Sequence, residues 1–176
     1  MSIRRILLFC LICFSSFALA QEDAGTAAEI IQGQPSSWPE WFGSFHLILL
    51  HFPIALINML VVSELLLLLT RRPIFEQSSR FLVISAAILT PPDALLGFIY
   101  GFSMTYEGVR EQLFWLHLSF GVITAILAVI VAFLRMRRGV NKVYYLYLFL
   151  LFFIVNITAF FGGALTFGLY HLHPPV

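Results

Sequence analysis

Charged residues are scarce in this 176-residue chain. Asp, Glu, Lys and Arg make up 11% of it, whereas soluble proteins carry about 25%. Hydrophobic residues make up 60%, which is above the usual content of a soluble domain. The formal net charge of +1 also provides no basic stripe for nucleic acid. The composition therefore excludes a soluble domain and a nucleic-acid-binding protein, and it predicts a protein of the lipid bilayer.

Cysteine is confined to two positions, Cys10 and Cys13. Both lie in a short apolar run that follows two arginines and ends at Ala18-Leu19-Ala20, a pattern typical of a secretory signal peptide. We expect residues 1–20 to be this signal peptide, cleaved after its last alanine. The mature chain then has no cysteine, which excludes disulfides, thiolate metal sites and cysteine nucleophiles. Phe14 and not histidine directly follows Cys13, so the CxxC spacing is no c-type haem attachment site.

The rest of the chain contains four apolar segments, each near or above the roughly 20 residues that cross a hydrocarbon core. They cover residues 45–70, 79–100, 113–134 and 143–170. Their short connections favour antiparallel neighbours. The sequence therefore predicts an all-α integral membrane protein, an up-down bundle of four transmembrane helices after a cleaved signal peptide. We expect a polar extracytoplasmic linker over residues 21–44, the transmembrane domain over 45–172 and an extracytoplasmic tail over 173–176.

Basic residues are distributed unequally between the two sides of this bundle. The second connection holds only Arg110, whereas the first and third connections and their flanks hold Arg71, Arg72, Arg80, Arg135, Arg137, Arg138 and Lys142. The positive-inside rule places the first and third connections in the cytoplasm. Both mature termini are then expected outside, as a signal peptide also requires.

Ionisable residues inside the predicted helices are expected to face the bundle interior. At helical rise, His51, His117 and Asp93 lie roughly 6 to 10 Å below the outer boundary. We expect these three side chains to meet in one buried site, with His46 at the boundary and His171 just beyond the fourth helix.

Prolines interrupt two of the predicted helices. Pro53 cannot donate to the carbonyl group of Leu49, so the first helix is expected either to kink or to begin near Phe52. Pro91-Pro92 is expected to deform the second helix directly before Asp93.

Three further polar residues lie deep in the bundle. We expect Asn58 and Asn156 to form a hydrogen bond between helices. Near the cytoplasmic boundary, we expect Glu64 to pair with one of the nearby arginines, namely Arg71, Arg72 or Arg80.

Three motifs resemble those of one bacterial membrane protein family. Residues 45–56, FHLILLHFPIAL, resemble the FHPLLVHFPIAL opening of the domain of unknown function 2231 family. His117 and Gly121 resemble its later H-x-x-x-G, and residues 158–170 resemble its glycine-rich close. The resemblance implies a four-helix protein of the bacterial inner membrane. It implies no established activity, although related domains often accompany cytochrome-type modules, which favours a redox role.

The chain departs from the family pattern in two of these motifs. Leu47 stands where the opening motif has proline. Phe160 and Phe167 stand where the closing motif often carries histidine, so a ligand from the fourth helix would have to be His171.

Three functional hypotheses follow. The first is a b-type haem site for electron transfer, in which His51 and His117 bind the iron, Asp93 supports a ligand and His46 lies nearby. The second is a copper or zinc site drawn from the same four residues and His171. The third is a non-catalytic accessory or scaffold protein whose polar residues join its helices.

The sequence shows none of the motifs of the common hydrolases. It has no phosphate-binding loop and no zinc-protease motif, and no nucleophile lies beside a positioned base. We therefore favour a protein without enzymatic activity of its own. Its expected partners are the lipid bilayer and other respiratory or cytochrome-type membrane proteins.

Overall fold

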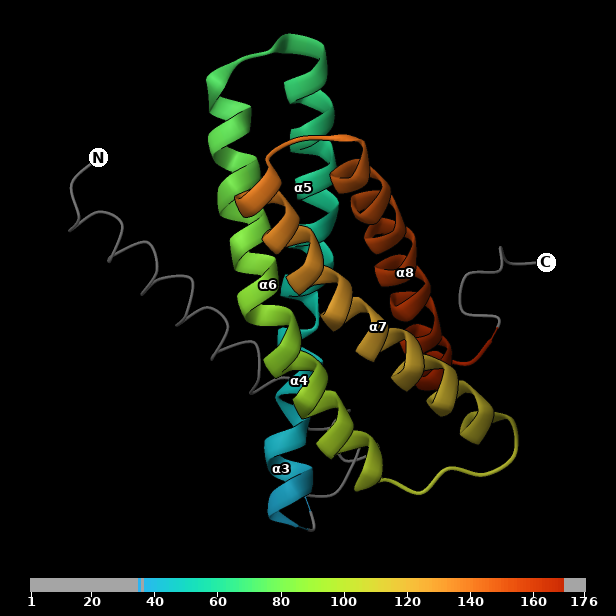
Figure 1. The fold of residues 1–176 in the computed structure, drawn as a ribbon. Coiled ribbons are helices and arrows are strands. Elements are labelled where there is room, and N and C mark those ends of the chain that lie inside the picture. Colours follow the sequence, from blue (N-terminus) through green and yellow to red (C-terminus); the bar gives the residue numbers. More distant parts are fainter. Residues whose placement is uncertain (1–34, 36, 170–176) are drawn as a thin grey trace, which may run out of the picture. The chain divides into compact units, whose positions relative to one another are not determined.

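The computed structural model describes residue 35 and residues 37–169. Every regular element of this part is a helix, as Figure 1 shows. The helices are α3 (Trp38–Ser44), α4 (His46–Leu49), α5 (His51–Thr70), α6 (Pro73–Phe102), α7 (Val109–Arg138) and α8 (Lys142–Phe167). The expected signal peptide, most of the expected linker, the tail and His171 lie outside the described residues.

Four stretches of helix are long and apolar enough to cross a membrane. They are residues 38–70, which combine α3, α4 and α5, and the single helices α6, α7 and α8. The prediction of an integral membrane protein with four spans is confirmed. The second and third helices are longer than the apolar segments that revealed them, because a helix continues through polar residues after it leaves the hydrocarbon core.

Local sequence ends these helices in two tight turns. Arg71 adopts a left-handed conformation with φ of 54°, which ends α5, and Pro73 begins α6 at a position where its missing N–H is not needed. At the second turn, the side chain of Asn141 accepts a hydrogen bond of 2.9 Å from the backbone N–H of Tyr144 and caps α8. Both turns lie among the basic residues, and we call this end of the molecule the arginine end.

The two proline sites behave differently. In the first span the helix is interrupted at Phe45 and again at Leu50, so that His46 lies on the short separate helix α4. This agrees with the expectation that a new helix begins close to Pro53. The expected deformation at Pro91-Pro92 does not break α6, which continues through both prolines to Phe102.

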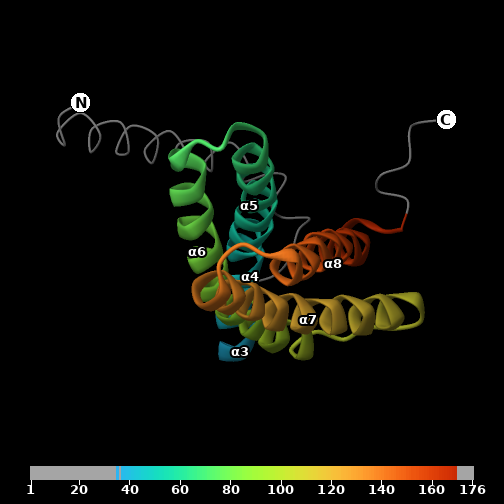
Figure 2. The same cartoon turned by 45° about the horizontal axis from the view of Figure 1, so that its top comes forward.

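The long helices form two antiparallel pairs. Helices adjacent in sequence pack on each other, and α5 also contacts α8, so the four spans close into a ring of neighbours. Figures 1 and 2 show that the pair α7 and α8 is inclined to the pair α5 and α6, and that the pairs diverge away from the arginine end. The expected up-down order is present, but the two pairs are not parallel. We call the divergent end, which carries the 103–108 connection, the cavity end.

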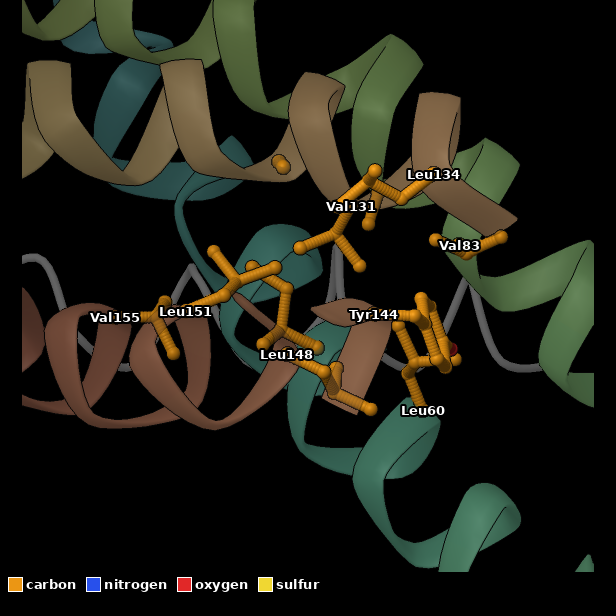
Figure 3. Packing of buried hydrophobic residues seen from close by; sticks show 11 residues of the cluster. Leu60, Val83, Val131, Leu134, Tyr144, Leu148, Leu151 and Val155 are labelled. Atoms are coloured by element: carbon orange, nitrogen blue, oxygen red, sulfur yellow. The ribbon is translucent and has the colours of Figure 1, made fainter. Parts of the chain in front are cut away.

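The hydrophobic core lies toward the arginine end and receives side chains from all four long helices, as Figure 3 shows. Its members are Ile57, Leu60, Val83, Ala86, Ala128, Val131, Leu134, Tyr144, Leu148, Leu151 and Val155. Most other apolar side chains of the spans face outward, where lipid covers them. The core therefore joins the two pairs at one end and leaves space between them at the other.

A buried ion pair reinforces the arginine end. The Nε atom of Arg135 lies 3.3 Å from Oε1 of Glu64, and both side chains are almost fully buried. The hydroxyl groups of Tyr144 and Tyr145 donate to the two carboxylate oxygens, at 2.8 and 3.3 Å. The arginine nitrogen is not aligned for a hydrogen bond, so charge attraction joins the pair.

This arrangement corrects the expected partner of Glu64. Its partner is Arg135 from α7 and none of the three expected arginines. Arg80 instead pairs with Glu76 within α6, at 2.9 Å. Arg71 and Arg72 are exposed.

Candidate functional site

A cavity of about 500 Å³ lies between the two helix pairs at the cavity end. Helices α4, α5, α6, α7 and α8 all contribute to its wall. Its volume lies within the roughly 300 to 1,000 Å³ typical of ligand and cofactor pockets. Most of the wall is apolar, and the ionisable side chains on it are His46, His51, Asp93 and His117, with Tyr100 and Tyr106.

The imidazole of His46 is fixed by Asp93. Its Nδ1 atom lies 2.9 Å from Oδ1 of Asp93 and 3.1 Å from the backbone oxygen of the same residue. Asp93 is buried, with 7% of its surface exposed. A carboxylate and a carbonyl oxygen can only accept hydrogen bonds, so Nδ1 carries the proton. In the neutral imidazole the Nε2 atom of His46 then keeps its lone pair.

The imidazole of His117 is fixed in the same way by the neighbouring helix. Its Nδ1 atom lies 2.9 Å from the backbone oxygen of Thr158 on α8. This acceptor again places the proton on Nδ1 and leaves the lone pair on Nε2. The hydroxyl of Thr158 bonds back to Ile154 and lies 3.1 Å from the hydroxyl of Thr124, which strengthens the contact between α7 and α8.

The two imidazoles are close to each other. Their ring centroids are 6.1 Å apart, and the ring planes are inclined by 60°. One ring comes from the first helix pair and the other from the second. The site therefore depends on the packing of both pairs.

Two glycines make room for these rings. A Cβ atom placed on Gly97 would lie 2.9 Å from Cε1 of His46, and one on Gly162 would lie 2.9 Å from Cε1 of His117. Both distances are shorter than ordinary van der Waals contacts. The groups packed against Gly97 and Gly162 are therefore the two imidazoles.

His51 has a different environment from the other two histidines. It lines the same cavity, but it is exposed, and its Nδ1 atom lies 3.3 Å from the backbone oxygen of Ile48 in its own segment. Of the expected group, the structure places Asp93 and His117 near each other, and His46 takes the position between them that was expected for His51. The first span is divided on both sides of His46, although the backbone at Phe45 and Leu50 stays right-handed helical.

The described residues contain no group of three or more His, Cys, Asp or Glu side chains that could hold a metal ion. Structural zinc sites have four protein ligands, and catalytic zinc sites have three. The described part of the chain alone therefore does not assemble the ligand set expected for a protein-coordinated zinc or copper ion. His171, the remaining candidate ligand, lies outside it.

Asn58 and Asn156 are joined as expected. The side-chain amide nitrogen of Asn156 on α8 donates to the amide oxygen of Asn58 on α5, at 3.3 Å. This hydrogen bond links the two pairs between the core and the cavity, and it is a structural contact.

Comparison with known proteins identifies a family but no characterised relative. No curated protein and no solved structure matches the chain. Residues 44–171 match the family model described as a predicted membrane protein, DUF2231. This region includes all four long helices and every residue of the cavity wall. The chain therefore belongs to the DUF2231 family of predicted membrane proteins.

Proposed function

We propose that this protein binds one b-type haem in the cavity and serves in electron transfer, and that His46 and His117 would hold its iron. The observation that carries the proposal is the spacing of these two imidazoles, each of which has its Nδ1 atom beside an acceptor oxygen. Each has its Nδ1–H bound to an acceptor, and each keeps a lone pair on Nε2. Two such imidazoles on one cavity are the ligand set of a bis-histidine haem.

The ring separation supports this proposal. A metal–imidazole bond is about 2 Å long, so two imidazoles that share one iron need ring centroids roughly 6 Å apart. The observed separation is 6.1 Å. His51 was the expected ligand, but its ring is exposed and bonds within its own segment. The proposal therefore replaces His51 by His46.

The cavity wall also suits a large, flat and mostly apolar group. Side chains such as Ile54, Phe98, Phe114 and Leu118 line it and make most of its wall apolar. Exclusion of water and the second hydrogen bond of each ligand are two means by which a protein sets the potential of a haem. When bound, the haem would supply one-electron chemistry.

The protein's own residues have distinct tasks in this proposal. His46 and His117 bind the iron, while Asp93 and the backbone oxygen of Thr158 hold the two rings in place. Because the site lies within membrane-spanning helices, the electron partner we propose is another respiratory or cytochrome-type membrane protein. No proton donor or nucleophile needs to act on a substrate, which fits a carrier of electrons better than an enzyme.

The test is the visible spectrum and haem content of the full-length protein purified in detergent after expression with sufficient haem supply. We expect an intense Soret band in the wild type and its loss in His46→Ala and His117→Ala. His51→Ala is the matched control, since it removes a histidine from the same cavity wall, and it should keep its haem.

Other outcomes would contradict the proposal in different ways. Haem loss in His51→Ala with retention in His46→Ala would return the ligand role to His51. Bound copper or zinc without a Soret band would favour the metal site, and absence of both would favour the scaffold role.

A further inference from the structure

The two imidazoles of the site have chemically unequal partners. His46 donates to the carboxylate of Asp93, whereas His117 donates to the neutral peptide oxygen of Thr158. A carboxylate withdraws the Nδ1 proton more strongly than a peptide oxygen, so it makes the imidazole that it accepts from the more electron-rich ligand. His46 also lies 3.1 Å from the peptide oxygen of Asp93, so the carboxylate is what distinguishes the two rings, and the difference exists without any bound group.

Asp93 also brings a negative charge into the interior. Its side chain is 10% exposed, and among the described residues His46 is the only side chain within ion-pair distance of it. A buried carboxylate needs a compensating charge nearby. The iron of a bis-histidine haem carries one more positive charge when oxidised than when reduced, so Asp93 favours the oxidised state.

We propose that Asp93 is the positioning residue that holds the reduction potential of this site low, through its hydrogen bond to His46. This inference rests on the haem function proposed above. Both effects of Asp93 act in the same direction, because an electron-rich ligand and a nearby negative charge each stabilise oxidised iron. The unequal partners also make His46, and not His117, the ligand through which the potential is set.

The test is a spectroscopic redox titration of the full-length protein at one fixed pH. Asp93→Asn keeps the shape of the side chain but removes its charge, and its midpoint potential should shift upward from that of the wild type. Asp93→Glu retains the carboxylate and should shift the potential less. Ser79→Ala is the matched control, because Ser79 is a buried, uncharged residue of the same helix that does not line the cavity. Its potential should equal that of the wild type.

The electron paramagnetic resonance spectrum of each oxidised variant shows whether two histidines still bind the iron. An unchanged or lowered potential in Asp93→Asn, with both histidines bound, would overturn the inference and leave the haem proposal intact. If Asp93→Asn retains no haem, Asp93→Ser takes its place, since a hydroxyl can also accept from Nδ1 without a charge. Loss of haem from both neutral variants would overturn the tuning role in favour of a purely structural one. A wild type without haem would overturn the proposed function itself.

Discussion

The imidazole rings of His46 and His117 lie with their centroids 6.1 Å apart on one cavity, although they belong to different helix pairs. Each ring is held by an acceptor on the next helix, Asp93 on α6 for His46 and Thr158 on α8 for His117. The spacing of the two rings therefore depends on four separate helices.

The space around the two rings should limit cofactor binding. In Gly162→Ala the new Cβ atom would lie 2.9 Å from Cε1 of His117, so the ring must move away from its acceptor. Loss of such a supporting contact typically weakens a bound metal group by about tenfold or more. We expect weaker haem affinity, measured by haem transfer to an acceptor protein. Gly121→Ala is the control, because its nearest neighbour would be Cγ2 of Thr158 at 3.9 Å, an ordinary contact. Equal affinities in the two variants would contradict the prediction.

The buried ion pair at the arginine end should contribute strongly to stability. Glu64→Gln leaves Arg135 charged and almost fully buried without its counter-ion. Removal of one partner from a buried pair costs about 3 kcal/mol or more. We expect a decrease of this size in the free energy of unfolding, measured by denaturation in mixed detergent micelles.

An exposed pair provides the matched comparison for that change. Glu76→Gln removes the carboxylate that pairs with Arg80 at 2.9 Å, but both side chains are about half exposed. Exposed pairs contribute about 1 kcal/mol at most. A loss in Glu76→Gln as large as that in Glu64→Gln would show that burial is not the cause.

The hydrogen bond between Asn58 and Asn156 should couple α5 to α8 only weakly. Its length is 3.3 Å, and Asn156 also donates to the backbone oxygen of Phe152 at 2.7 Å. Hydrogen bonds between membrane helices average about 0.6 kcal/mol. A double-mutant cycle with both residues changed to alanine should give a coupling energy of that order. A coupling near zero would assign Asn156 to its own helix alone.

The distribution of basic residues predicts the orientation of the chain in the membrane. The arginine end, with the turns at 71–72 and 139–141, should face the cytoplasm, and the 103–108 connection with the cavity should face outward. A periplasmic alkaline phosphatase reporter should be inactive after Lys142 and active when inserted in the 103–108 connection. Reporter activity only after Lys142 would show that the chain has the opposite orientation.

Much of the fold follows from the sequence alone. The four spans can be predicted from the sequence because each transmembrane helix needs an apolar run long enough to cross the hydrocarbon core. This requirement applies to each segment independently. The link between Asn58 and Asn156 is also visible, since two deep amides need hydrogen-bond partners and have few alternatives. The depth of each residue along its own helix was enough to predict that Asp93 and His117 lie at the same level of the bundle. These properties depend on one segment at a time.

Only the tertiary structure decided which groups meet. His46 and not His51 lies beside Asp93, in a span that is divided at Phe45 and Leu50 although the backbone of both residues stays right-handed helical. Glu64 pairs with Arg135 and not with the arginines nearer in the sequence. This pairing is possible because α8 packs on α5, and α7 packs on both α6 and α8. Helical periodicity fixes the faces of an unbroken helix, but it contains no information on where a helix breaks or how inclined pairs pack. The choice of partners therefore depends on the packing of separate helices, which is a property of the whole chain.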